Sequence, residues 1–308
     1  MPSIIIFLIP YTEATYMITV TIGVLGLMKR RYWIYFLGFF LASLTRPSFT
    51  FLLLSIIGTE FFFLVKHKNF KSGILNLLSR IAPLLVGTTV VSLIQYAYGR
   101  GGWFKFIEVQ KYWNNILSVP HNLRDWSHEG FGINIGVIFL VAIPLLITIF
   151  QLLYTQFIHN KNKPVVSYQS RKDYLLVLSI LYLIGNSLFV VFFHGGSLHC
   201  LFRFTICSPF FYILLFIAFD YIRQIPLNIR FFQIGTLILV SGLVNYSTKW
   251  DFSDLGIFIF IGTITLWLFQ DLKSNLIYKT SLVLLLSVNV VWTTYLFNTY
   301  IVNGWIFA

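Results

Sequence analysis

Long apolar runs alternate with short polar stretches along the whole chain of 308 residues. A helix that crosses a membrane needs about 20 mostly apolar residues. Against that length, the apolar runs predict ten crossings, several of them short, at 14–28, 32–44, 49–65, 81–97, 133–153, 174–193, 205–219, 231–245, 256–270 and 277–297. The predicted fold is all-α, a polytopic transmembrane helical bundle that forms a single integral membrane domain over residues 1–308.

The composition agrees with this pattern. Hydrophobic residues make up 57% of the chain and charged residues only 10%, and the mean hydropathy is +0.81. So few charges could not cover the surface of a soluble protein of this size, which excludes soluble enzyme folds. The net charge of +12 is therefore interpreted as a topology signal and not as a nucleic-acid interface. The expected environment is a lipid bilayer, with no nucleic acid as partner.

Lysine and arginine collect in alternate loops. These loops hold 15 of the 22 basic residues: Lys29 to Arg31, Lys66 to Lys71 with Arg80, Lys161 to Lys172, Arg223 and Arg230, and Lys273 and Lys279. Cytoplasmic loops carry such an excess, so this set is predicted to be cytoplasmic and the other loops to face outward. Richness in Phe, Ile, Lys, Asn and Tyr indicates an AT-rich genome. It favours a bacterial inner membrane, with the endoplasmic reticulum as the alternative.

The apolar run at residues 3–9 is far too short to cross a bilayer and resembles the end of a helix. We therefore expect an upstream segment to be missing. The sequence shows no basic region followed by a cleavage site, so it does not indicate a signal peptide. The longest stretch between spans is about 98–132, on the predicted outer face, where aromatic residues at helical spacing predict an interfacial helix over 102–117.

Polar residues that are costly at a membrane gather on the predicted outer side. Glu13 opens the first span, where it is either an acid favoured by the helix dipole or a substrate-binding residue. Arg46, at the outer turn before Pro47, is either a snorkelling base or a clamp for a lipid phosphate. Arg203 follows the glycine-containing stretch 194–199 and has the same two interpretations.

The most polar stretch of the chain is 121–129, which contains two histidines, Arg124, Asp125 and Glu129. Its two acids could serve as a base, or hold a divalent cation with the histidines, although no established metal spacing is present and a solvated loop explains them as well. No other cofactor is indicated. The chain also shows no nucleotide-binding loop, no cytoplasmic catalytic cluster and, on this assignment of spans, no charged residue buried within one.

The spacing of several motifs resembles that of the PIG-V-type mannosyltransferases, polytopic glycosyltransferases of the GT-C class. The resemblance runs from about residue 3 to about 215 and is strongest over 8–50. It is carried by Tyr11-Thr12-Glu13-Ala14, the basic turn Lys29 to Arg31 followed by Trp33, Leu41 to Pro47, Gly102-Trp103 through Gln110, Trp113 to Pro120, and Ser197 to Phe204 with Pro209.

The resemblance implies transfer of a hexose, typically mannose, from a polyprenyl-phosphate sugar donor to a lipid or glycan acceptor on the non-cytoplasmic face. For such a transfer we expect Arg46 and Arg203 to bind the donor phosphate, and Glu13 to orient either the sugar or the family's first outer loop. Gln110, Trp113 and His199 are expected near the sugar or donor. The family's essential aspartate would lie upstream of Met1. The catalytic base is then outside this chain, with Glu13 and Asp125 as substitutes, and the chain by itself is expected to be inactive if truncated.

Three other functions compete with this hypothesis. A secondary transporter predicts repeats with broken helices and ionisable groups at the midplane, and the sequence shows neither. A polymerase or ligase of surface polysaccharides would use outer arginines and histidines and accept a lipid-diphosphate-linked oligosaccharide. A catalytically inactive membrane subunit would also explain the missing loop.

Overall fold

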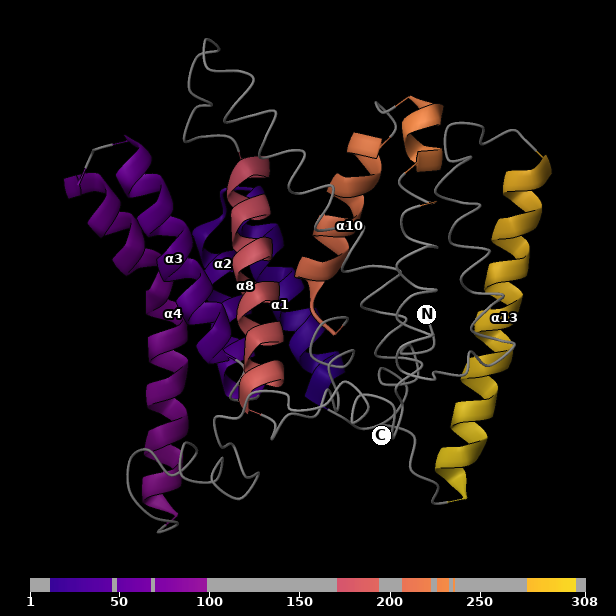
Figure 1. The fold of residues 1–308 in the computed structure, drawn as a ribbon. Helices are drawn as coiled ribbons and strands as arrows, with labels where there is room; N and C mark the ends of the chain where they lie inside the picture. Colours follow the sequence, from indigo (N-terminus) through magenta and orange to yellow (C-terminus); the bar gives the residue numbers. More distant parts are fainter. Residues whose placement is uncertain are drawn as a thin grey trace.

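The computed structural model describes residues 12–45, 49–67, 70–98, 171–193, 207–222, 226–232, 235 and 276–302. The long elements of this part are all α-helices, in the order α1 (Thr12–Met28), α2 (Tyr32–Thr45), α3 (Phe49–His67), α4 (Phe70–Ala97), α8 (Arg171–Phe193), α10 (Pro209–Ile222) and α13 (Leu276–Ile301) (Figure 1). The described part contains no strand, which confirms the all-α prediction.

One stretch of the described residues, Gly73–Ala97 in α4, is long and apolar enough to cross a membrane. Four shorter apolar helices accompany it, at Thr12–Met28, Tyr32–Thr45, Thr50–Val65 and Asp173–Phe189. The predicted spans at 133–153, 231–245 and 256–270 lie wholly or largely outside the described residues. The number of crossings therefore stays a prediction.

Helices α1 and α2 form a tight hairpin because the end of α1 is capped by its own backbone. The Arg31 amide donates to the Gly26 carbonyl at 2.9 Å, and the Arg30 amide donates to the Leu27 carbonyl at 3.3 Å. Arg30 takes a φ of 54°, in the left-handed region usually filled by glycine at the end of a helix. This capping pattern turns the chain within three residues and starts α2 at Tyr32.

Glycine lets the backbones of α1 and α2 approach closely. A Cβ on Gly38 would meet the backbone of Gly23 and would lie 2.8 Å from the Thr19 carbonyl oxygen. A Cβ on Gly26 would meet the backbone of Tyr35. Small residues at such spacing are the usual means by which helices pack at short range within a membrane. The pair α1 and α2 therefore forms one rigid unit.

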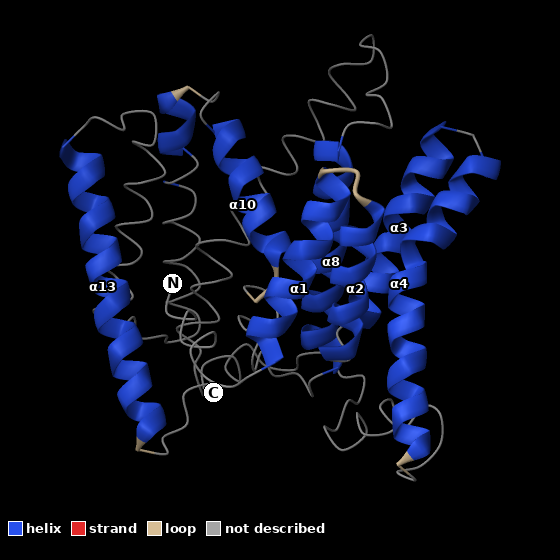
Figure 2. Cartoon of the chain, turned by 180° about the vertical axis from the view of Figure 1, so that it is seen from behind, coloured by secondary structure: helices blue, strands red, loops and turns tan. Residues whose placement is uncertain are grey.

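The side-chain contacts of α3 define its direction relative to α8. Phe63 stacks on Tyr174 with ring centroids 5.8 Å apart, and Phe51 meets Phe189 at 5.1 Å. Rising residue numbers in α3 thus match falling numbers in α8, so the two helices are antiparallel. Glu60 of α3 contacts Arg80 near the start of α4, and these neighbours are also antiparallel (Figure 2).

Helices α2 and α4 run parallel. Tyr35 contacts Arg80, and Ser43, about two turns further along α2, lies against Gly87, about two turns further along α4. Helices α4 and α8 are both antiparallel to α3, so they are parallel to each other and to α2. Helix α1 is antiparallel to α2, so it is also antiparallel to α8. This relation determines which residues of α1 and α8 lie at the same level.

The helix ends that carry the basic residues lie together. In Figures 1 and 2 the turn between α1 and α2, the end of α3 and the start of α4, the end of α10 and the start of α13 are all at the upper end of the molecule. Since α8 is parallel to α4, it also begins there. We call this the basic end, after Lys29, Arg30 and Arg31. The helices α1, α3 and α10 begin at the opposite end.

One predicted boundary is wrong. The sequence pattern placed Arg80 in a cytoplasmic loop and began the fourth span at residue 81, whereas α4 begins at Phe70 and Arg80 lies within it. Ten residues of helix separate Phe70 from Arg80, a distance of about 15 Å. The basic character of 66–71 suggested a loop that extended as far as Arg80. Within the helix, the charge of Arg80 has a partner on α3.

Candidate functional site

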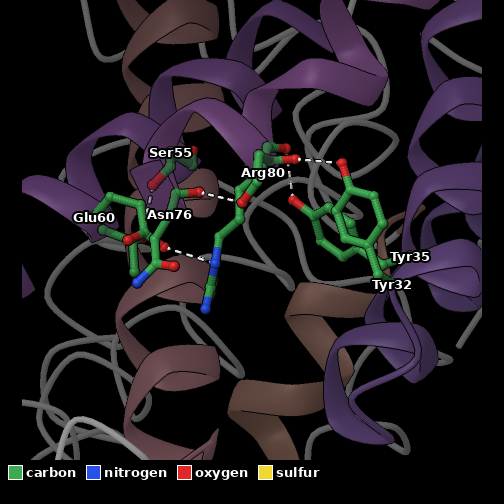
Figure 3. A network of polar contacts seen from close by, with 8 residues as sticks. Tyr32, Tyr35, Ser55, Glu60, Asn76 and Arg80 are labelled. Carbon is green, nitrogen blue, oxygen red and sulfur yellow. Dashed lines mark hydrogen bonds and ion pairs between the residues drawn. The ribbon is translucent and has the colours of Figure 1, made fainter. Parts of the chain in front are cut away.

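A buried ion pair lies between α3 and α4, in the half of the molecule nearer the basic end. Arg80 Nε lies 3.0 Å from Glu60 Oε1 (Figure 3). The Glu60 side chain is only 2% exposed and that of Arg80 22%. The expectation that no charged residue is buried within a span is therefore wrong for Glu60. Hydropathy missed it because one acid in a 19-residue apolar helix hardly changes the average.

One aromatic ring packs on the Arg80 guanidinium. The central carbon of the guanidinium lies 4.1 Å from the centroid of the buried Tyr174 ring, a cation–π contact. Phe63 in turn stacks on Tyr174, with ring centroids 5.8 Å apart. The charge of Arg80 thus faces a carboxylate on α3 and an aromatic ring on α8, which compensates for its removal from water.

Tyrosines of α2 satisfy backbone groups of α4. The Tyr32 hydroxyl donates to the Ser79 carbonyl at 2.9 Å, and the Tyr35 hydroxyl donates to the Arg80 carbonyl at 2.7 Å. Pro83 lies four residues after Ser79 and has no amide hydrogen, so the Ser79 carbonyl lacks its usual helical donor. The hydroxyl of Tyr32 replaces that donor.

We call Tyr32, Tyr35, Glu60, Arg80 and Tyr174 the ion-paired cluster. It joins four helices, α2, α3, α4 and α8, through contacts between its own members and the α4 backbone. A charge pair of this kind fixes the register of the helices that it joins, because any other register would separate the charges in a low-dielectric interior. The contacts of this cluster therefore hold helices together in one register.

A second set of buried polar groups lies between α1 and α8. The hydroxyls of Tyr16 and Tyr182 are 3.0 Å apart and form a buried hydrogen bond between the two helices. Glu13, one turn before Tyr16, is 0% exposed. It lies near the start of α1, so it is at the end of the molecule opposite to the basic end (Figure 1).

Asn186 lies at the same level as Glu13. It follows Tyr182 by one helical turn, as Glu13 precedes Tyr16 by about one turn, and antiparallel helices place both on the same side of the tyrosine pair. Asn186 is 2% exposed. Within the described part of the chain, neither its Oδ1 nor its Nδ2 has a hydrogen-bond partner. We call Glu13, Tyr16, Tyr182 and Asn186 the α1–α8 seam.

The seam can recognise hydroxyl groups. A carboxylate accepts hydrogen bonds, and a primary amide both donates and accepts them. Phe210 packs on Tyr182 with ring centroids 4.6 Å apart and adds an apolar wall. Carboxylate, amide and aromatic side chains together suit a ligand with both hydroxyl groups and apolar C–H faces.

Only one of the site residues named from sequence falls in the described part of the chain. Glu13 is buried in the seam, as a functional residue would be, and its burial also suits an acid at the start of a helix. The others lie outside the described residues: Arg46, Gln110, Trp113, Asp125, His199 and Arg203. The outer segment 98–132 is likewise outside them, except for Tyr98.

Sequence reasoning did not single out Asn186 or Tyr182. Both lie within an apolar run that was assigned as a span at 174–193. The sequence feature that could have identified Asn186 is a side-chain amide within an apolar run. Such an amide is costly in a membrane unless it forms hydrogen bonds or has a function. Within the described ranges, no group of three or more His, Cys, Asp or Glu side chains could hold a metal ion.

No family model, no curated protein and no solved structure matches this chain.

Proposed function

We propose that this protein is an integral membrane glycosyltransferase of the GT-C type. It transfers a hexose, mannose in the first instance, from a polyprenyl-phosphate donor to a lipid or glycan acceptor on the non-cytoplasmic face. The observation that carries the proposal is the complete burial of Glu13 in a polar seam at the end opposite to the basic turns. A carboxylate kept in the interior at that end is difficult to explain by packing alone.

The arrangement of the basic helix ends supports a membrane-embedded bundle of about ten spans. Since basic loops remain in the cytoplasm, the basic end would face the cytoplasm and the seam would lie toward the other face. Many apolar side chains of the helices are exposed, including Leu54, Leu75 and Leu286, as is expected of surfaces that contact lipid. A bacterial inner membrane is the proposed location.

The chemistry requires a base for the acceptor hydroxyl and cations for the departing polyprenyl phosphate. In this proposal Glu13 orients the sugar, and Arg46 and Arg203 bind the phosphate. Gln110, Trp113 and His199 line the donor. Within this chain, Asp125 is the candidate base.

The test is a transfer assay on the purified chain in lipid nanodiscs. Radiolabelled polyprenyl-phosphate mannose is the donor, and membrane lipid extract and oligosaccharide are the acceptors. Glu13→Gln should lower transfer by about 10- to 100-fold, as loss of a hydrogen bond to a charged group does. Asp173→Asn, an acid at the basic end in the first turn of α8, is the matched control and should leave transfer unchanged.

Three results would contradict the proposal. Transfer that Glu13→Gln leaves intact would remove Glu13 from the site. Use of a lipid-diphosphate oligosaccharide in place of the monophosphate sugar would favour a polysaccharide polymerase or ligase. No transfer from any donor would favour a non-catalytic membrane subunit.

A further inference from the structure

Asn186 is an anomaly in the packing of α8. Buried side-chain amides in folded proteins nearly always have hydrogen-bond partners, and leaving both ends of an amide without one lowers stability. At 2% exposure, Asn186 is withdrawn from solvent, and both of its polar atoms lack a partner within the described residues. A leucine of similar size would fill the position without this loss.

The surroundings of Asn186 indicate what could satisfy it. The tyrosine pair closes one side, since the Tyr16 and Tyr182 hydroxyls bond to each other. At the level of Asn186, the facing helix α1 carries the buried Glu13 carboxylate, one turn before Tyr16. A carboxylate and an amide at the same level of two antiparallel helices offer hydrogen-bond acceptors and one donor group to a small polar ligand that reaches both.

We propose that Asn186 and Glu13 bind two hydroxyl groups of a hexose, so that the α1–α8 seam is a sugar subsite. The inference rests on the proposed function and assigns the sugar of that reaction to this seam. Hydroxyl groups donate to the carboxylate and to the amide oxygen, and accept from the amide nitrogen. A bare cation would use only the oxygens and be repelled by the amide hydrogens, and a lipid tail would satisfy neither group. The Tyr182 and Phe210 rings provide the apolar side that a sugar ring requires.

The test combines stability with binding. Asn186→Leu removes the unbonded amide and keeps the volume, so the ligand-free protein should unfold about 2 °C or more above the wild type. The same variant should bind hexose about tenfold more weakly, because it loses the hydrogen bonds to the sugar. Both quantities are measured on the full chain in nanodiscs from the tryptophan fluorescence of unfolding, titrated with methyl α-mannoside.

Ser179→Ala is the matched control. Ser179 is 0% exposed and its hydroxyl has no partner within the described residues, but it lies one turn before Tyr182, on the far side of the tyrosine pair from Asn186. It should raise the unfolding temperature slightly and leave hexose binding unchanged. Asn186→Ala provides a second variant for the binding measurement if the leucine is not accommodated.

The ligand arms separate donor from acceptor. Methyl α-mannoside tests binding of the sugar alone, polyprenyl-phosphate mannose tests binding of the donor, and an oligosaccharide tests binding of the acceptor. At least one of the three should bind the wild type more tightly than Asn186→Leu. A lower unfolding temperature for Asn186→Leu, unchanged hexose affinity in the variant, or no binding by the wild type would each overturn the subsite. Hexose binding without transfer would support the subsite and contradict the proposed function. Transfer that Asn186→Leu leaves unchanged would support the proposed function and contradict the subsite.

Discussion

The ion-paired cluster and the α1–α8 seam both bury polar side chains between helices, yet they differ in how those groups are paired. In the cluster, Arg80 faces the Glu60 carboxylate at 3.0 Å and the Tyr174 ring at 4.1 Å. In the seam, the Asn186 amide has no partner within the described residues. Paired groups hold helices in place, whereas an amide buried without a partner lowers stability and requires an explanation such as a bound ligand or water.

The two regions also lie at different ends. The cluster lies toward the basic end and joins α2, α3, α4 and α8. Figure 3 shows its members Tyr32, Tyr35, Glu60 and Arg80. The seam lies toward the opposite end and joins α1 to α8. Helix α8 is common to both, with Tyr174 in the first region and Tyr182 in the second. The cluster therefore fixes the helix on which half of the seam is built.

The largest effect should follow from breaking the ion pair on one side only. Arg80→Leu leaves the Glu60 carboxylate buried without its cation, and should lower the free energy of unfolding by about 3–5 kcal/mol. Adding Glu60→Leu should recover most of that loss, because the double variant buries no charge. Denaturant titration of the single and double variants in micelles measures both. If the single variant loses less than about 1 kcal/mol, the pair behaves as a surface pair and not as a clamp.

The next effect concerns the frame of the seam. Gly38→Ala places a methyl group against the Gly23 backbone, and should lower stability by about 1–3 kcal/mol as overpacking does. It should also weaken hexose binding, since α1 carries Glu13 and must shift. Gly185→Ala is the control, because its Cβ would meet only Phe51 Cδ1 at 3.8 Å, an ordinary contact. Equal losses in the two variants would show that the close approach of α1 and α2 is unimportant.

The smallest effect should come from the tyrosine pair. Tyr182→Phe removes one hydrogen bond while its ring still packs on Phe210, and should lower stability by about 1 kcal/mol. Tyr16→Phe removes the same Tyr16–Tyr182 bond, so the losses of the two single variants should not add fully in the double variant. Additive losses in thermal unfolding would mean that this bond contributes nothing to stability.

The helices were largely predictable because local signals bound them. The second span was predicted at 32–44 and α2 runs from Tyr32 to Thr45, since a basic turn precedes it and Arg46-Pro47 follows it. Glu13 was also found from sequence, because a charge at the start of an apolar run is conspicuous. Hydropathy failed at Arg80, where the surroundings of a charged residue depend on an ion pair with another helix. Arg80 lies within α4, where its charge has a partner in Glu60, twenty residues earlier on α3.

Asn186 could not be found for a related reason. An amide in an apolar run changes the average hydropathy little, and its burial depends on the packing of other helices around α8, which no local pattern contains. The same holds for Tyr32, whose contact with the Ser79 carbonyl depends on the position of Pro83 in another helix. Pairings between distant helices, and not the helices themselves, were the part that needed a structure.

The most direct test of the central claim is photo-crosslinking with a polyprenyl-phosphate hexose that carries a diazirine on the sugar. The measurement does not require turnover, so it reports donor binding alone. Mapped by mass spectrometry, the crosslinks should fall on the start of α1 around Glu13 and on α8 around Asn186, and excess unlabelled donor should remove them. Crosslinks around Glu60 and Arg80 at the basic end, or labelling that unlabelled donor does not reduce, would contradict the account.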